Sequence, residues 1–497
     1  MSSLNEITTL CKAGQLQEAY RLAKADLEQQ CPWAQRLMGW ALYYLIKDDT
    51  DKADYKSLLS HLDELKSLEQ LSATSDQLLF DKVIFKVALF IHHHLTPEKT
   101  DTPSRLSALF SRLRHIQFEP SKGYSFLLMS CIRCQQWYEM ADFIEWWNLN
   151  KLTEEDYKPF KTETGRRIIS LAERAYIAYA KALLRQNDLG RIEEFLPLLD
   201  NLMEKHTDMT YPGYFYGKLL IKLGSNPEEA LKVIVPFARK KITEFWVWQV
   251  LGDVFDDESD KKLACLIRAT HCRTQESFLV KVRIRLAQLY IKRSLLNQAK
   301  HQIDKATATY LSEGWRMPYE LECMIHQPWL NTTKPDDKPP IDFMSITDSI
   351  ICEGAEEAVA IVTSFDKKSN KTYMICGREK RMAQQLRFKA ATGTALKITF
   401  IKDADRRVRL LKTERTSLPK DLDYAKAVEG TIQKRQDKEF AFLKADDSKY
   451  FIPPSLVSKH KLQGGDKIKA LVVYDYNRKK EVWDWICISI IHQPQPH

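Results

Sequence analysis

Residues 427–490 read AVEGTIQKRQDKEFAFLKADDSKYFIPPSLVSKHKLQGGDKIKALVVYDYNRKKEVWDWICISI. Short runs of Val, Ile, Thr, Tyr and Phe alternate here with polar residues, as in β-strands that bury one face. The stretch predicts five short strands, at residues 428–434, 440–444, 450–452, 467–474 and 482–490, with a Gly-Gly-Asp turn before the fourth. Five short strands in this order are typical of a small Greek-key barrel.

Two phenylalanines lie two positions apart on the second predicted strand. Phe440 and Phe442 share one face of that strand, because alternate residues of a strand point the same way. If the face is exposed, unpaired bases can stack on the rings while nearby lysines and arginines contact the phosphates. If it is covered, the rings only fill a face that packs on a neighbouring domain. The sequence leaves both interpretations open.

The same segment resembles cold-shock and related single-strand-binding OB domains. In that family a Lys-Gly-Phe-Gly-Phe strand and a Val-Phe-Val-His strand place aromatic side chains next to each other. The resemblance implies a nucleic-acid-binding surface at Lys434, Arg435, Lys438, Phe440, Phe442, Tyr450 and Phe451.

The segment also departs from the family pattern at several positions. Glu439 and Ala441 replace the two glycines, and Pro453 stands where the family has histidine. Lys434 and Arg435 stand where the family has aromatic residues on the first strand. These departures imply binding that is weaker, less selective or lost.

The preceding segment, residues 356–416, predicts a degenerate copy of the same barrel. Ile361 corresponds to Thr431 and Gly393 to Gly465, at offsets of 70 and 72 residues. Both copies show strand, turn, strand, basic link, glycine turn and strand. The basic link of the first copy predicts either a phosphate-binding track or an ordinary solvated face, and consists of Arg378, Lys380, Arg381, Arg387 and Lys389.

The charge distribution agrees with this interpretation of the C-terminal part. The chain has 75 Lys+Arg and 66 Asp+Glu, a net charge of +9. Residues 341–497 hold 29 and 21 of these, which leaves 46 and 45 for residues 1–340. An excess of eight positive charges on the last third suits a polyanion-binding module, although charge alone does not separate it from a solvated surface.

A proline-rich stretch divides the chain. Residues 331–343 read NTTKPDDKPPIDF, which cannot continue a helix and favours an extended spacer. Upstream, apolar residues recur at three- and four-residue spacing, as in LAERAYIAYAKALL at residues 171–184, and predict consecutive amphipathic helices. The expected architecture is a multidomain chain: an all-α helical repeat array over 1–330, the linker, a degenerate OB-like barrel over 344–416 and a cold-shock-like barrel over 424–492.

The helical part contains an internal repeat of about 35 residues. Small residues recur at Gly217, Gly252 and Ala287, spaced by 35 and 35, and again at Ala230, Ala264 and Ala299, spaced by 34 and 35. Paired antiparallel helices need small residues where they approach. The pattern resembles the tetratricopeptide repeat, and CKAGQLQEAYRLAKADLEQQCP at residues 11–32 resembles a further copy. The resemblance implies a groove that docks a peptide or protein partner, with a purely structural superhelix as the alternative.

Three other features are better explained by structure than by chemistry. The aromatic stretch of residues 137–160 favours a helical core over a partner surface. Cys131 and Cys134 have metal-ligand spacing, yet no second Cys or His pair accompanies them, so they are expected to be core thiols. The run His92–His94 is expected at a helix C-terminus, where histidines interact with the helix dipole.

Composition and missing motifs exclude other classes. With 44% hydrophobic and 28% charged residues, the chain is globular, and it shows neither a signal peptide nor an apolar run long enough to span a membrane. Ten scattered cysteines are typical of reduced thiols in a cytoplasmic protein. No phosphate-binding loop, zinc-protease motif or nucleophile elbow is found, so we expect no enzyme, no cofactor and no metal. The oligomeric state is not predicted.

Two functions follow from the sequence. The first is a non-catalytic adaptor that binds single-stranded RNA or DNA, with RNA favoured, through the barrels and a protein partner through the helical groove. The second is a protein-interaction scaffold whose barrels do not bind nucleic acid. The whole architecture also resembles uncharacterised bacterial proteins of conflict (defence) loci that join tetratricopeptide repeats to a cold-shock-like domain.

Overall fold

The computed structural model describes residues 4–72, 74–165, 167–386, 388–402, 408–445, 447–477 and 481–492. The chain divides into two compact units, residues 1–241 with 249–256, and residues 242–248 with 257–497. In the described ranges, no helix combines the length and the apolar character that crossing a bilayer demands.

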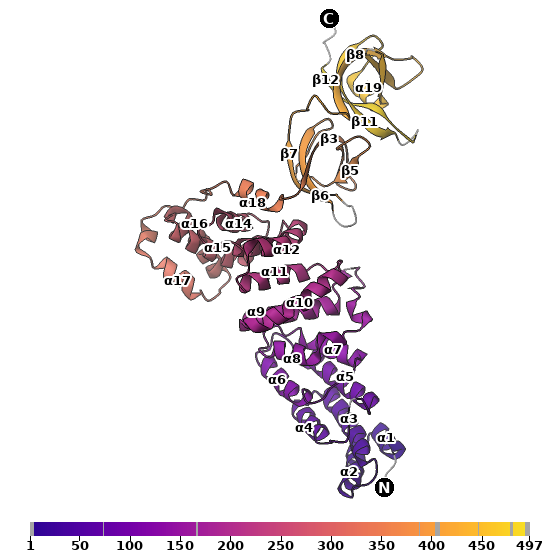
Figure 1. Cartoon of the computed structure of the whole chain (residues 1–497), viewed down its shortest axis with the longest axis vertical. Coiled ribbons are helices and arrows are strands. Elements are labelled where there is room, and N and C mark those ends of the chain that lie inside the picture. The colour runs from indigo at the N-terminus through magenta and orange to yellow at the C-terminus, as the bar shows by residue number, and fades with distance from the viewer. Residues whose placement is uncertain are drawn as a thin grey trace. The chain divides into compact units, whose positions relative to one another are not determined.

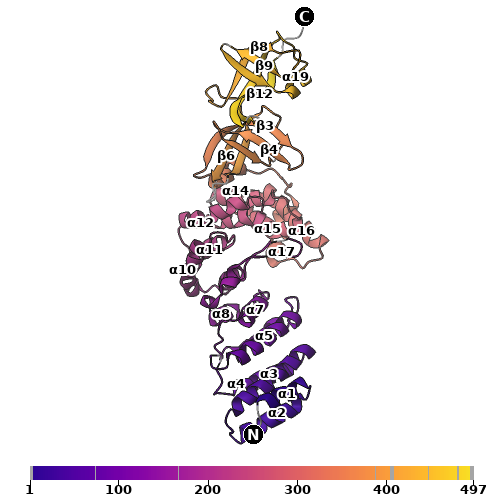
Figure 2. The same ribbon diagram turned by 90° about the vertical axis from the view of Figure 1, so that its right-hand side faces the viewer.

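The first unit consists almost entirely of helices joined by short turns (Figures 1 and 2). Helices α3, α5, α7, α9 and α11 pack against one another in series. The elements are α1 (Leu4–Lys12), α2 (Leu16–Glu28), α3 (Ala34–Lys52), α4 (Tyr55–Lys66), α5 (Gln77–His94), α6 (Thr102–Leu113), α7 (Lys122–Cys131), α8 (Met140–Trp147), the 3-10 helices η1 (Leu149–Lys151) and η2 (Glu154–Tyr157), the short strands β1 (Phe160–Lys161) and β2 (Arg167–Ile168), α9 (Leu171–Gln186), α10 (Leu189–Lys205), α11 (Pro212–Lys222) and α12 (Pro227–Lys240).

Helix α9 shows how the sequence sets one of these helices. It begins where the Ser170 hydroxyl accepts a hydrogen bond from the backbone N–H of Glu173, and it ends at Asn187 in the left-handed conformation. Its buried stripe includes Ala172, Ala175 and Leu183, which pack on neighbouring helices. The helix predicted for residues 171–184 is thereby confirmed.

The structure also places the aromatic stretch in the helical core. Trp137 and Trp147 are 1% and 0% exposed, and Trp146 packs partly buried against the same cluster. The histidine run ends α5, as expected, with His94 as its last residue. Both observations confirm the structural interpretation of these motifs.

The predicted small residues lie where paired helices meet. Gly217 on α11 faces Ile234 on α12 so closely that an added Cβ would lie 2.2 Å from the Ile234 Cγ1. Ala230 on α12 is 1% exposed. The later small residues Ala287 and Ala299 are also fully buried, on α15 and α16.

The second unit begins with helices and continues into two β-sheets. Helix α13 (Phe245–Asp253) contains residues of both units. The remaining elements are α14 (Asp260–Thr270), α15 (Glu276–Lys292), α16 (Leu296–Ser312), α17 (Tyr319–Ile325), η3 (Pro328–Asn331), α18 (Phe343–Ile351), β3 (Glu356–Asp366), β4 (Lys371–Ile375), β5 (Arg381–Gln384), β6 (Ala395–Lys402), β7 (Val408–Arg415), β8 (Ala425–Gln433), β9 (Ala441–Ala445), β10 (Ser448–Ile452), α19 (Pro454–His460), β11 (Lys467–Asn477) and β12 (Val482–His492).

The last five strands form a closed barrel in the order β10-β12-β11-β8-β9. The five strands before them form an open sheet in the order β5-β4-β3-β6-β7. Matched strand by strand, the two orders are the same, except that β5 and β7 do not pair as β10 and β12 do. The Gln384 side chain bridges that gap by donating a hydrogen bond to the Val408 carbonyl at 2.8 Å.

The two sheets repeat the same turn in atomic detail. The N–H of Gly393 donates to the Val362 carbonyl at 2.8 Å, and the N–H of Gly465 donates to the Ile432 carbonyl at 2.9 Å. Both glycines are left-handed, with φ of +90° and +96°, which explains why glycine occurs at both positions. The correspondence predicted between Gly393 and Gly465 is confirmed.

The two sheets pack against each other through a shared apolar cluster. Ile361, Ile375 and Ala395 of the open sheet meet residues of the barrel that include Leu471 and Val473. An added Cβ at Gly393 would lie 2.5 Å from the Ser489 Oγ, so the two sheets approach closely there. The expected fold class, a helical repeat array followed by two OB-like β domains, is confirmed, with the first β domain open rather than closed.

Gly217 gives a test of the helix pairing. Gly217→Ala should destabilise the protein by about 1–3 kcal/mol, because the new Cβ overlaps Ile234. Gly213→Ala on the same helix is the matched control, since its Cβ would meet Val233 at an ordinary 3.5 Å. Urea unfolding followed by circular dichroism measures both. Equal stability of the two variants would contradict the close pairing.

Candidate nucleic-acid interface

Strands β9 and β10 point one row of side chains into the barrel and the next row outward. In their antiparallel register Leu443 pairs with Tyr450, and Phe442 pairs with Phe451. Leu443 and Tyr450 are 0% and 5% exposed and belong to the barrel core. Phe442 and Phe451 lie on the opposite, outer face, because side chains alternate along each strand.

Three phenylalanine rings gather on this outer face. The ring centroids of Phe440, Phe442 and Phe451 are 5.8, 5.6 and 5.9 Å apart, pairwise, in tilted and edge-to-face geometry. All three side chains are half-buried and keep part of their surface open to solvent. We call these residues the phenylalanine platform. It brings together three of the residues that the sequence predicted.

Tyr450 is not part of the platform, which corrects the prediction. Its ring lies in the barrel core, 6.3 Å from that of Trp485, and the Lys426 ammonium group lies 5.3 Å from it. The reason is strand alternation: Tyr450 immediately precedes Phe451 and therefore points to the other face of the sheet. A buried ring has no accessible face for a base.

The predicted basic residues of the loop between β8 and β9 differ in their ion pairing. Lys434 and Arg435 are exposed and form no ion pair among the described residues. Lys438 is also exposed, but its Nζ lies 3.4 Å from the carboxylate of the neighbouring Asp437. Lys434 and Arg435 are therefore better placed than Lys438 to contact an anion.

Two further lysines, which the sequence reasoning missed, flank the platform. Lys444 and Lys449 are exposed and lie directly opposite each other on β9 and β10. They share the outer face with Phe442 and Phe451, because each lies two positions from one of these rings. Like charges opposite each other are unfavourable unless an anion lies between them. The two lysines could have been identified in the sequence, because each lies two positions from a phenylalanine of the platform on the same strand.

Two residues of the basic link of the open sheet, Arg378 and Arg381, contact side chains of the barrel. Arg378 is exposed and its guanidinium lies 4.8 Å from the Tyr474 ring, and Lys380 and Lys389 are also exposed. Arg381 is only 25% exposed and lies 3.7 Å from the carboxylate of Asp475. Arg387 lies outside the described residues.

The equivalent of the platform in the open sheet is largely lost. Because Val362 corresponds to Ile432, the register of β3 and β4 places Tyr373 at the position of Phe442. The partner of Tyr373 is Ala383, where the barrel has Phe451. The Arg381 guanidinium lies 5.3 Å from the Tyr373 ring. A single, partly covered tyrosine therefore replaces three phenylalanines.

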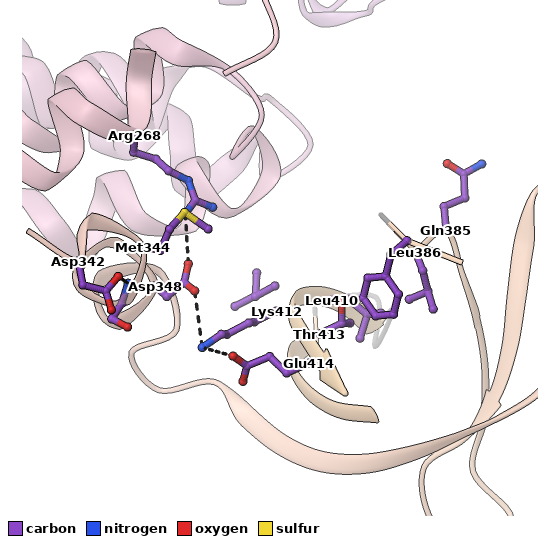
Figure 3. Close-up of a pocket in the computed structure, with 13 residues that line it drawn as sticks. Arg268, Asp342, Met344, Asp348, Gln385, Leu386, Leu410, Lys412, Thr413 and Glu414 are labelled. Carbon is purple, nitrogen blue, oxygen red and sulfur yellow. Dashed lines mark hydrogen bonds and ion pairs between the residues drawn. The ribbon is translucent and has the colours of Figure 1, made fainter. Parts of the chain in front are cut away.

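A cavity of about 450 Å³ lies elsewhere in the second unit, between α14, α18 and β7 (Figure 3). Four of the five charged side chains that line it are paired with one another, and the fifth, Asp342, accepts a hydrogen bond from the backbone N–H of Ser345 at 3.1 Å. The Asp348 carboxylate lies 3.7 Å from both Arg268 and Lys412, and Lys412 lies 3.0 Å from Glu414. The hydrogen bond to Glu414 raises the pKa of Lys412. These paired charges hold α18 against its neighbours and leave little net charge for a ligand.

The pair of cysteines with metal-ligand spacing is buried. Cys131 and Cys134 are 2% and 4% exposed, and burial raises the pKa of both thiols. Within the described ranges, no group of three or more His, Cys, Asp and Glu side chains is arranged to hold a metal ion. The two thiols pack with the helical core, as predicted.

Comparison with family models agrees with the geometry of the barrel. Residues 426–490 match the S1/CSD-like domain 2 of the TOTE conflict systems, where CSD denotes the cold-shock domain. Residues 210–346 match a domain of unknown function, DUF7017. The comparisons with curated proteins and with solved structures found no match. The C-terminal barrel is therefore similar to an OB-like domain of conflict systems, whereas the tetratricopeptide resemblance stays a prediction.

Because β9 and β10 have a buried and an outer face, aromatic substitutions on the two faces should reduce stability by very different amounts. Tyr450→Ala should destabilise the barrel by about 3–5 kcal/mol, because it empties a core position. Phe442→Ala should cost about 1 kcal/mol or less, because its ring is already half open to solvent. Hydrogen exchange of the β8–β12 amides in the full chain measures both. A Phe442→Ala loss as large as that of Tyr450→Ala would show that the platform is core.

Proposed function

We propose that this protein is a non-catalytic adaptor that binds single-stranded nucleic acid, RNA in preference to DNA, through the outer face of its C-terminal barrel. In this proposal the helical part binds a protein partner. The observation that carries it is the phenylalanine platform, which lies on the outer face of a barrel similar to S1 and cold-shock domains. A role in defence is supported by the match to conflict systems.

The chemistry of the platform fits unpaired bases. Each base has an apolar π-face that stacks on an aromatic ring, and such stacking does not require a particular base. Lys444 and Lys449 lie beside the rings and Lys434 and Arg435 lie on the adjacent loop, at positions suited to the phosphates that connect stacked bases. The departure at Glu439 adds an exposed carboxylate near these cations, which favours modest affinity.

The second candidate function is a protein scaffold whose barrel does not bind nucleic acid. The observation that favours it is the open sheet, where the equivalent surface lacks the aromatic pair and its Arg381 is engaged with Asp475. If the C-terminal barrel has likewise lost nucleic-acid binding, only its packing against the open sheet remains. The experiments below separate the two functions.

Stacking predicts that the platform contributes affinity without contributing charge. In the full chain, Phe442→Ala and Phe451→Ala should each weaken binding of a single-stranded oligonucleotide by about 1–3 kcal/mol per stacked base, with an unchanged salt dependence. Fluorescence anisotropy over a series of salt concentrations measures both quantities. No detectable binding of the unmodified chain at low salt would favour the scaffold.

Phosphate binding predicts the opposite signature for the lysines. Lys444→Gln and Lys449→Gln, like Lys434→Gln and Arg435→Gln, should each lower the slope of log affinity against log salt by about 0.7 for every phosphate that the variant no longer neutralises. Lys367→Gln, on the exposed turn between β3 and β4, is the matched control and should leave the slope unchanged. Equal slopes in all five variants would argue against phosphate binding beside the platform.

A further inference from the structure

Helix α9 of the first unit presents a stripe of positive charge. Arg174, Lys181 and Arg185 lie on one side of this helix, since residues spaced by seven and eleven return to the same face. Arg133, which follows α7, lies close enough to Arg174 to lower its pKa. We call these four residues the α9 basic surface.

Three of the four cations donate hydrogen bonds to neutral groups, and the described residues form no ion pair with them. The Arg133 guanidinium donates to the Nδ1 and the carbonyl of His92, both at 3.0 Å. Lys181 donates to the side chain of Gln135 at 3.1 Å, and Arg185 donates to the Trp137 carbonyl at 3.3 Å. These contacts fix the positions of the charges without neutralising them.

Arg174 is the most unusual member. Its side chain is half-buried, and among the described residues its guanidinium has no hydrogen-bond or ion-pair partner. Burial and, to a smaller extent, the nearby positive charge of Arg133 lower the pKa of Arg174 from the ordinary value, so both effects disfavour its charged form. The guanidinium nitrogens themselves stay open to solvent, so an anion from outside can reach them.

The carboxylates near this part of the chain are committed elsewhere. Asp142 and Glu145 pair with Arg191 at 2.5 and 3.1 Å, and Glu145 also accepts a hydrogen bond from Tyr179 at 2.5 Å. Glu173 accepts the backbone N–H groups of Thr210 and Tyr211, both at 2.9 Å. Glu98 acts on Arg133 only from beyond ion-pair distance. None of these carboxylates forms an ion pair with the α9 basic surface.

Apolar groups border the same surface. The Phe126 ring on α7 lies 5.5 Å from that of Phe85 and 5.3 Å from that of His92, which holds Arg133. Phe85 is 44% exposed. A ligand that reaches Arg133 therefore also finds an exposed aromatic side chain on the adjacent helix.

We propose that the α9 basic surface binds an acidic segment of a partner protein, with Asp or Glu carboxylates on Arg133, Arg174 and Lys181 and an apolar side chain against Phe85. This deepens, and rests on, the proposed role of the helical part. A short cluster of cations beside an apolar group matches a few carboxylates. Residues 1–340 have 46 basic and 45 acidic residues, so their net charge of +1 attracts a long polyanion such as a nucleic acid only weakly from a distance, whereas the local cluster can still bind a few carboxylates at short range.

The test uses the full chain and a synthetic peptide of glutamates and glycines with one central phenylalanine. The peptide should bind, and a version with glutamine in place of glutamate should not. Arg174→Gln should weaken binding about tenfold or more, because a half-buried charge pair loses one partner. Lys66→Gln, an equal charge change on the exposed face of α4, is the matched control and should leave binding unchanged.

Two further measurements keep this result separate from nucleic-acid binding and from misfolding. Arg174→Gln should keep or raise the melting temperature, since it removes a half-buried charge that lacks a partner. It should also leave oligonucleotide affinity unchanged, just as Phe442→Ala should leave peptide affinity unchanged. The proposal is overturned if the glutamate peptide does not bind, or if Arg174→Gln lowers the melting temperature markedly. It is also overturned if this variant loses affinity for the oligonucleotide and keeps its affinity for the peptide.

Discussion

The close approach of strands β8 and β9 at Gly430 governs the geometry of the C-terminal barrel. A Cβ at this position would lie 2.3 Å from the Lys444 carbonyl oxygen, so only glycine permits the two backbones to come together there. This close approach aligns Thr431 with Lys444 and Gln433 with Phe442. A slip of one residue would turn Phe442 inward and Leu443 outward, and neither the core nor the platform would form. Fold and candidate function thus depend on the same register.

The open sheet shows what the same topology becomes under different constraints. Its strand order and its glycine turn match those of the barrel, yet its strands β5 and β7 are linked by the Gln384 side chain and not by a ladder. The rings that would form a platform are reduced to Tyr373. In exchange, Ile361 and Ile375 bury an apolar surface against the barrel, and the Tyr424 hydroxyl donates to the Val359 carbonyl at 2.6 Å. The first copy supports the second by packing, and the second retains the surface for stacking.

The strands of the two β domains, their glycine turns and helix α9 were predictable from the sequence because they depend on local patterns. Alternation and the glycine turns located the strands, and helical periodicity located α9, since these features depend on neighbours in sequence. Alternation could also have removed Tyr450 from the candidate site and added Lys444 and Lys449, because one position along a strand reverses the face. The family pattern specifies aromatic residues at neighbouring positions but not the strand face of each, so it did not separate Tyr450 from Phe451.

The remaining features depend on partners that are distant in sequence. Nothing in the sequence of the basic link distinguishes Arg381 from Lys380. In the structure, however, Arg381 lies beside Asp475 of the next domain, which is 94 residues further along the chain. No helix was predicted between the third and fourth strands of the barrel, yet α19 lies there, and Pro454 occupies its first helical position, which suits proline. Arg174 is an ordinary helix residue in sequence. That none of the described residues pairs with it becomes visible only when the side chains of α7 and α9 are placed together.

The two candidate binding surfaces show that local pairing of charge, and not net charge, decides what a surface can bind. The second unit contains many cations, yet those around the cavity at Asp348 are joined in a chain of ion pairs and offer little to an anion. The helical part is close to neutral, yet neutral hydrogen-bond acceptors hold Arg133, Lys181 and Arg185, and Arg174 beside them has no acceptor among the described residues. A cation held by a neutral acceptor keeps its charge for a ligand and needs little reordering when the ligand arrives. Such preorganisation reduces the entropic cost of binding, so a small cluster in a neutral region can discriminate among anions better than a larger excess of mobile charge.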